Sequence, residues 1–290
     1  MSITPAGILS NRKVIRVMKF LNLGCGFKYV KAKEWLNADM MSVGDDVVKC
    51  NFLDGIPFES NSFDLVYHSH VLEHFAKADG EKFIAECYRI LKPGGFIRIA
   101  LPNLEVIAKE YLKNLERATS GEHNADNDYD WIMLEMYDQT VRNKTGGNMM
   151  NYLIKDKIPN EQYVFNRIGA GGKQWREEYR NPANAEKDRK TGFKKIMERP
   201  SLIFKGIKQL FIRIVLPKKD HQYYKVGQFR FSGEIHQWMY DRYSLGRLLQ
   251  QVGFKEIVVR TATTSYIENW AMYKLDDTTE SASLFIEATR

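Results

Sequence analysis

A short apolar run that ends in two glycines constrains the fold of this chain more than any other feature. Residues 17–23 (VMKFLNL) read as a buried strand, and Gly24-Cys25-Gly26 follows at once. Glycine after a buried strand lets the backbone turn tightly and lets a ligand approach with no Cβ in the way. The pattern predicts a strand that ends at a ligand-binding turn.

An acidic residue further along the chain limits the class of ligand that this turn can bind. Asp39 stands fifteen positions after Gly24, just past a second apolar strand at residues 35–38. A carboxylate there can accept both hydroxyl hydrogens of a ribose. The dinucleotide pattern G-x-G-x-x-G would need glycine at position 29, where the chain has Tyr29. We therefore expect an adenosine cofactor rather than a pyrophosphate cradle.

In the remaining segments, apolar residues recur either with the spacing of a strand or with that of a helix. Further strands are predicted at residues 46–50, 63–68, 96–101, 255–261 and 283–288, and helices at residues 74–91 and 243–252. Lys92-Pro93-Gly94-Gly95 is expected to stop the first helix and turn the chain. Strands separated by helices predict an α/β sheet covered by helices.

Composition excludes several classes of protein. The chain has 290 residues, of which 44% are hydrophobic and 27% charged, so disorder and collagen-like repeats are excluded. Three cysteines, Cys25, Cys50 and Cys87, match no metal spacing and predict reduced thiols in a cytoplasmic protein. The N-terminus lacks the apolar core of a signal peptide, and no run of about 18 apolar residues predicts a spanning helix.

The pattern changes between residues 104 and 230, where the chain becomes aromatic, charged and irregular. We expect one core domain formed by residues 1–103 and 231–290, with residues 104–230 as an insertion or cap. Glycine pairs at residues 146–147 and 169–172 are expected to be turns.

Four segments in register resemble a known family. The run LNLGCG, Asp39, the loop and strand IPFESNSFDLVYHSHVLEH, and RILKPGGFIRIALPN resemble the motifs of class I S-adenosylmethionine-dependent methyltransferases. The tail resembles the last helix and the sixth and seventh strands of that fold. Within the family, the chain looks most like the branch associated with surface-polysaccharide and glycolipid biosynthesis.

The resemblance implies a Rossmann-like seven-stranded sheet, mostly parallel with an antiparallel last strand, and a large helical insertion after the fifth strand. It implies S-adenosylmethionine as the cofactor. Two positions depart from the family pattern, since Asn22 replaces a frequent acid and Lys28 replaces the third glycine. The residues expected to bind the cofactor are Asn22, Gly24, Cys25, Gly26, Asp39, Asn51, Phe52, His68 and Ser69.

Methyl transfer to a hydroxyl needs alignment of the reacting atoms and removal of a proton. His70 and His74 follow the fourth strand and are the candidates for the base, because imidazole has a suitable pKa. The alternative is that either histidine caps the helix or packs on adenosine. Candidate acceptor-binding residues suit a carbohydrate and are His123, Asp138, Arg142, His236 and Tyr240. No cluster in the sequence predicts a metal site, although a His with Asp residues could assemble one in space without a sequence pattern.

Positive charge gathers in one block. Residues 171–230 contain 16 Lys and Arg against 6 Asp and Glu, within a chain of net charge +7. Within the block, residues 201–216 have apolar residues at helical spacing with lysines and arginine opposite. This pattern is typical of a helix that lies on an anionic membrane, here the inner face of the cytoplasmic membrane. A helix packed on the core or on a partner subunit remains the alternative.

Three functions follow from these observations. The first is an S-adenosylmethionine-dependent methyltransferase that acts on a hydroxyl of a sugar or lipid-linked glycan. The second is an RNA or DNA methyltransferase that uses the basic block as a phosphate track. It is less favoured, because the fourth strand ends in YHSH rather than in an Asn/Asp-Pro-Pro-Tyr-like turn. The third is a non-catalytic partner subunit with the same fold.

Overall fold

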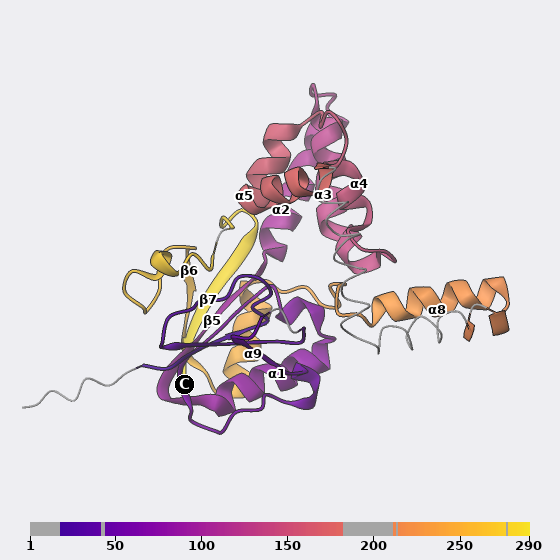
Figure 1. The fold of residues 1–290 in the computed structure, drawn as a ribbon. Helices are drawn as coiled ribbons and strands as arrows, with labels where there is room; N and C mark the ends of the chain where they lie inside the picture. Colours follow the sequence, from indigo (N-terminus) through magenta and orange to yellow (C-terminus); the bar gives the residue numbers. More distant parts are fainter. Residues whose placement is uncertain (1–17, 42–43, 182–210, 213, 277) are drawn as a thin grey trace, which may run out of the picture.

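The computed structural model describes residues 18–41, 44–181, 211–212, 214–276 and 278–290. Its centre is a seven-stranded sheet of order β3-β2-β1-β4-β5-β7-β6 (Figure 1). Strand β7 is antiparallel to both of its neighbours, and the other strands are parallel to one another. This arrangement confirms the predicted sheet. The strands are β1 (Phe20–Leu23), β2 (Trp35–Asp39), β3 (Val47–Lys49), β4 (Phe63–Ser69), β5 (Leu91–Pro102), β6 (Lys255–Arg260) and β7 (Ser283–Thr289).

Helices α1 (Lys77–Ile90) and α9 (Arg242–Val252) cover one face of the sheet. Each has an apolar stripe, which includes Phe83 and Cys87 on α1 and Leu245 and Leu249 on α9. These side chains pack into one core with alternate residues of the central strands. The other alternate residues, such as Phe20 and Tyr67, pack on the opposite face against the 3-10 turn η3 (Trp270–Tyr273) and Leu275.

The predicted start of α1 is wrong, whereas its predicted end agrees with the structure. The helix begins at Lys77 rather than at His74, because residues 72–74 form a separate 3-10 turn, η2 (Leu72–His74). The predicted turn at residues 92–95 lies inside β5 as an irregularity, because the pairing with β4 passes from Leu91 to Phe96 with a register shift. Gly94 has a φ of 75° and donates its N–H to the carbonyl of Arg290.

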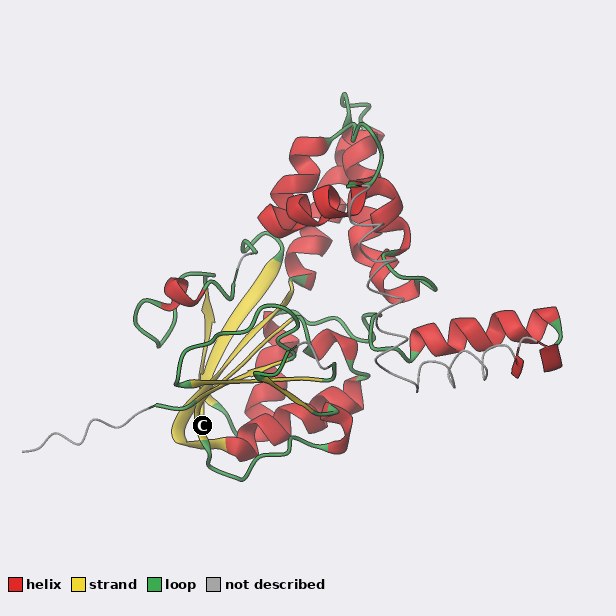
Figure 2. Cartoon of the chain, in the orientation of Figure 1, coloured by secondary structure: helices red, strands yellow, loops and turns green. Residues whose placement is uncertain are grey.

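The segment after β5 is helical (Figure 2). It contains α2 (Leu104–Thr119), α3 (Ala125–Val141), α4 (Gly147–Leu153), α5 (Glu161–Arg180) and α8 (Lys218–Arg230). Helices α2 to α5 gather beyond the carboxyl end of β5, whereas α8 extends away from the sheet (Figure 1). The helical group has a small core of its own, formed by Trp131, Tyr152, Leu153, Ile158 and Val164.

Glycines in this segment have two different roles. Gly146 and Gly147 form the expected turn and start α4. The turn expected at residues 169–172 is confirmed as a kink at Gly169, where a φ of 67° and a ψ of −167° are not helical and separate two helical parts of α5.

Most of the predicted membrane-contacting helix lies outside the described residues. This applies to residues 201–210 and 213 of the 201–216 segment and to residues 182–210 of the basic block. Among the helices that the structure describes, none combines the length and the apolar character that a bilayer-spanning segment needs.

Candidate functional site

The glycine turn packs directly against the segment that follows β4. Gly24 and Gly26 have φ values of 65° and 49°, which favour glycine. A Cβ on Gly24 would lie 2.3 Å from Cγ2 of Val71, whereas one on Gly26 would meet no atom within 4 Å. The first glycine is therefore required by packing inside the protein. The second leaves its surface open to a ligand.

Asp39 lies at the carboxyl end of β2, beside this turn. Its Oδ2 accepts a hydrogen bond of 2.8 Å from the N–H of Gly26, and its Oδ1 accepts one of 2.8 Å from the N–H of Met41. Each carboxylate oxygen has a second lone pair, so the acid can still accept ribose hydroxyls. An open glycine and an acid with remaining acceptor capacity fit the adenosine part of S-adenosylmethionine.

Asn22 supports the glycine turn through hydrogen bonds of its side chain. It is buried, and its Nδ2 donates to the carbonyl of Lys28 at 3.1 Å and to Oδ1 of Asn37 at 3.3 Å. A carboxylate cannot donate, so the amide explains why this position has no acid here. The structure thus gives Asn22 a positioning role at the turn.

Cys25 is a free thiol in the same turn. Burial and the neighbouring charge of Asp39 raise its pKa to about 12. The side chain is therefore neutral at physiological pH. Its predicted contact with the cofactor stays a prediction.

Asn51 and Phe52, which are expected to bind the cofactor, make contacts within the protein. Oδ1 of Asn51 accepts the N–H of Leu53 at 3.2 Å, and its Nδ2 donates to Asp54 at 2.8 Å. These bonds cap the 3-10 turn η1 (Phe52–Asp54). Phe52 is 4% exposed and packs on Phe83, so its side chain lies among the apolar residues of the core.

His68 also lies in the core. It is fully buried against Phe83, with a ring distance of 5.2 Å, and neither ring nitrogen has a hydrogen-bond partner. Burial lowers its pKa to about 4, so the ring is neutral at pH 7. Strand alternation explains this placement, because residue 68 faces α1. Ser69 is half-buried at the end of β4.

Glu73 lies at the centre of a cluster of histidines after β4. Its side chain is 0% exposed, and Oε1 lies 3.1 Å from Nδ1 of His70. Nε2 of His70 lies 3.2 Å from Oγ of Ser283 on β7. His70 has a φ of 53°, which is unusual for a residue with a side chain and is typical of functional sites. The structure therefore fixes His70 at the carboxyl edge of the sheet.

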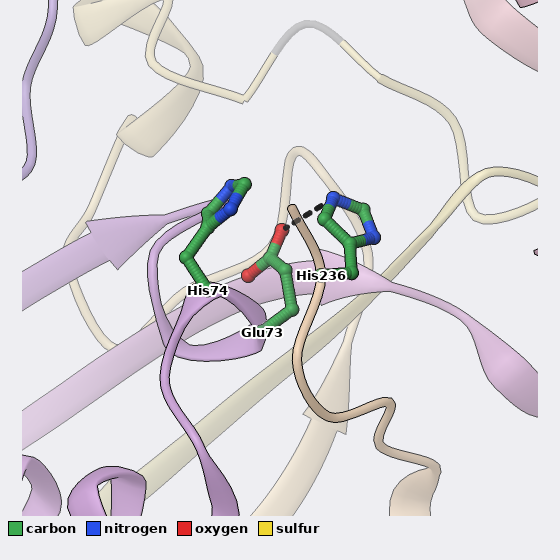
Figure 3. Close-up of side chains that lie close together, drawn as sticks. All are labelled: Glu73, His74 and His236. Atoms are coloured by element: carbon green, nitrogen blue, oxygen red, sulfur yellow. Dashed lines mark ion pairs between the residues drawn. The ribbon is translucent and has the colours of Figure 1, made fainter. Parts of the chain in front are cut away.

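His74 and His236 complete this cluster (Figure 3). Nε2 of His236 lies 4.0 Å from Oε1 of Glu73, and the rings of His74 and His236 meet edge to face at 4.9 Å. Burial lowers the pKa of His236 to about 3. Burial opposes ionisation of Glu73 and is the largest single effect, but the hydrogen bond with His70 and the electrostatic effects of His70, His236 and His74 together outweigh it and lower the pKa of Glu73 to about 2. At neutral pH the cluster thus contains a buried anion beside a neutral His236.

The remaining candidate acceptor residues do not join the cluster. His123 is exposed in the turn between α2 and α3. Asp138 is buried and accepts the N–H groups of Asn148 and Met149, so it caps α4. Arg142 pairs with Glu234 at 3.2 Å. Tyr240 is buried in the core beside Gly80.

Of the five predicted acceptor residues, only His236 lies beside Glu73. Glu73 itself was not among the predicted site residues. The sequence feature that points to Glu73 is an acid between two histidines, in residues 70–74 (HVLEH). The roles of His70 and His74 as the base stay predictions.

A cavity of about 460 Å³ adjoins His236. Its walls combine aromatic rings with hydrogen-bonding groups from α8 and from the segment before α9. The residues that line it are Thr140, Gly227, Arg230, Phe231, Ile235, His236, Gln237, Trp238 and Met239. The segment from His70 to His74 thus contacts both the glycine turn, through Val71, and the lining of the cavity, through the bonds of Glu73 with Gln237 and Trp238.

A seven-stranded sheet of this order, with a glycine turn after β1 and an acid at the end of β2, is the arrangement of a cofactor-binding α/β fold. Residues 22–99 match a family model described as a methyltransferase domain. This segment of the chain is therefore similar to a methyltransferase domain, and the match supports the predicted enzyme class. The match and the fit of the turn together support S-adenosylmethionine as the cofactor. No curated protein matches the sequence.

Solved structures give low similarity over almost the whole chain. A SAM-dependent methyltransferase from Archaeoglobus fulgidus has 13% identity and a TM-score of 0.37, with coverage of 94% of this chain and 86% of that one. A SAM-dependent methyltransferase from Thermotoga maritima, described as a possible histamine N-methyltransferase, has 14% identity, a TM-score of 0.36 and coverage of 94% and 82%. One from Mesorhizobium loti has 12% identity, a TM-score of 0.36 and coverage of 94% and 91%.

Proposed function

We propose that this protein transfers a methyl group from S-adenosylmethionine to a hydroxyl of a sugar or glycan. The observation that carries the proposal is the cavity beside His236, because its aromatic and polar lining suits a carbohydrate. Exposed rings stack on the apolar faces of sugars, and Arg and Gln side chains bind hydroxyls. Trp238 and Phe231 supply the rings, and Arg230 and Gln237 supply the polar groups.

The residues on the cofactor side have defined tasks in this reaction. The bound cofactor supplies an activated methyl group on a sulfonium. Asp39 binds the ribose, while Asn22 holds the glycine turn in the shape that leaves Gly26 open. Val71 packs on Gly24 and so sets the position of the turn relative to the end of β4. These contacts orient the methyl donor toward the acceptor side of the sheet edge.

The test is a methyl-transfer assay with several acceptor classes. The full-length protein is incubated with S-adenosylmethionine carrying a labelled methyl group and with sugars, lipid-linked glycans or RNA. We expect label in a carbohydrate product, and at limiting S-adenosylmethionine about tenfold less label with the Asp39→Ala variant. Label in RNA alone would overturn the carbohydrate proposal and support the nucleic-acid alternative.

Two tryptophans of similar exposure provide a matched pair for the acceptor site. Trp238 lines the cavity and is 41% exposed, whereas Trp175 on α5 is 43% exposed and does not line it. With a sugar acceptor, Trp238→Ala is expected to raise the acceptor KM about tenfold, as the loss of one stacking contact of about 1.4 kcal/mol implies. Trp175→Ala should leave that KM unchanged, and equal effects of both variants would exclude this cavity as the acceptor site.

A further inference from the structure

We propose that Glu73, His74 and His236 form a binding site for a divalent transition-metal ion, with zinc as the best fit. One ring nitrogen of each histidine and one carboxylate oxygen of Glu73 all lie within 4.8 Å of one another. Two imidazoles and one glutamate are a ligand set that zinc uses at sites with an open coordination position. Figure 3 shows the Glu73 carboxylate between the two rings.

The burial of Glu73 supports a cation at this position. Its side chain is 0% exposed, and Oε2 has no hydrogen-bond partner. In the described part of the chain, its ion-pair partners are the histidines His70 and His236, and no Lys or Arg pairs with it. A buried carboxylate is unfavourable unless donors or a cation satisfy both oxygens. A divalent ion bound by Glu73 supplies that compensation.

The hydrogen bond of His74 prepares its ring for a metal. Nδ1 of His74 lies 3.1 Å from the carbonyl oxygen of Ile235. A carbonyl only accepts, so Nδ1 donates its proton and Nε2 holds the free lone pair. Metal-binding histidines commonly donate their second ring N–H to a carbonyl or a carboxylate in this way.

Backbone contacts fix the ligands relative to one another. The N–H groups of Gln237 and Trp238 both donate to the carbonyl of Glu73, at 2.7 and 3.2 Å. Nε2 of Gln237 donates to the carbonyl of His74 at 2.8 Å. The segment that carries His236 is therefore attached to the turn that carries the other two ligands, although 161 residues separate His74 from Ile235. The protein itself assembles the three side chains.

The distances require only a local adjustment. Ligand atoms around tetrahedral zinc lie about 3.3 Å apart, given metal–ligand bonds of about 2.0–2.1 Å. The ligand atoms of the three residues lie within 4.8 Å of one another. Rotations of these side chains bring the atoms to the spacing that zinc requires. Because His236 also lines the cavity of about 460 Å³, water or a bound hydroxyl from that side completes the coordination.

The experiment measures metal binding without the methyl donor or an acceptor, so its result does not depend on the proposed methyl transfer. Full-length protein without an affinity tag is stripped with a chelator and titrated with Co²⁺, which reports nitrogen and oxygen ligation by visible absorption. We expect one equivalent of bound Co²⁺, displacement by Zn²⁺, and a higher melting temperature with Zn²⁺.

Variants assign the ion to these residues. Glu73→Gln, His74→Gln and His236→Gln are each expected to weaken Co²⁺ binding at least about tenfold. His123→Gln removes an exposed histidine and should bind as the unmodified protein does. His74 is only half-buried, so its variant is expected to fold even if the other two do not. Absence of Co²⁺ binding to the unmodified protein, or full binding by His74→Gln, would overturn the proposal.

Discussion

Oδ2 of Asp39 accepts a hydrogen bond of 2.8 Å from the backbone N–H of Gly26, and this bond joins the end of β2 to the glycine turn after β1. One carboxylate thus stabilises the turn and presents its remaining lone pairs to a ligand. Both tasks depend on the parallel pairing of β1 with β2, which brings the ends of the two strands to the same edge.

The first prediction concerns this carboxylate. Asp39→Ala removes a charged acceptor, and hydrogen bonds to charged groups contribute about 1.5–3 kcal/mol, so affinity for S-adenosylmethionine should fall at least about tenfold. Isothermal titration measures the change. Asp46→Ala is the control, because Asp46 is an exposed acid paired with Lys31 at 3.7 Å. Unchanged affinity in Asp39→Ala would show that the cofactor binds elsewhere.

The second prediction separates the two glycines of the turn. Gly24→Ala should lower the free energy of unfolding by about 2–4 kcal/mol, since the new Cβ meets Val71 and the backbone has a positive φ. Gly26→Ala has only the backbone cost, about 1 kcal/mol, because no atom lies within 4 Å. Urea unfolding compares the two variants, and equal losses would contradict the packing of Val71 on Gly24.

The third prediction concerns a buried ion cluster on the other side of the sheet. Arg98 on β5 is 0% exposed and pairs with Asp276 at 2.7 Å and with Glu287 at 3.0 Å. Arg98→Met leaves two buried carboxylates without this cation and should cost about 3–5 kcal/mol in urea unfolding. Lys109→Met breaks an exposed pair with Glu105 and should cost under about 1 kcal/mol. Comparable costs for the two variants would contradict the burial of the cluster.

The fourth prediction concerns pH. Burial lowers the pKa of His68 from 6.5 to about 4, so between these values the unfolded chain binds a proton that the folded protein does not. The contribution of His68 to stability is therefore complete above pH 6.5 and is lost as pH falls toward 4, by about 3 kcal/mol in all. Urea unfolding between pH 7 and 4 should show a shallower pH dependence in His68→Leu than in the unmodified protein. Parallel curves would mean that His68 is not buried as a neutral ring.

Local sequence pattern determined the sheet, the glycine turn and Asp39. Apolar runs of period 2 and helical stripes are properties of short segments, and the positions of residues 24, 26 and 39 follow from where those segments end. The start of α1 does not follow from local pattern. Residues Leu72–His74 form a separate 3-10 turn, and this turn depends on contacts with the distant segment 235–238.

Tertiary structure decided what each polar side chain of the site contacts. Phe52 and His68, predicted to bind the cofactor, are buried in the core, and Asp138, predicted to bind an acceptor, caps α4. Their roles toward a ligand stay predictions. Glu73 and His236 meet because the chain returns after a long insertion and pairs with the turn beyond β4. The partner of a buried polar group is set by long-range hydrogen bonds and desolvation, which spacing along one chain does not encode.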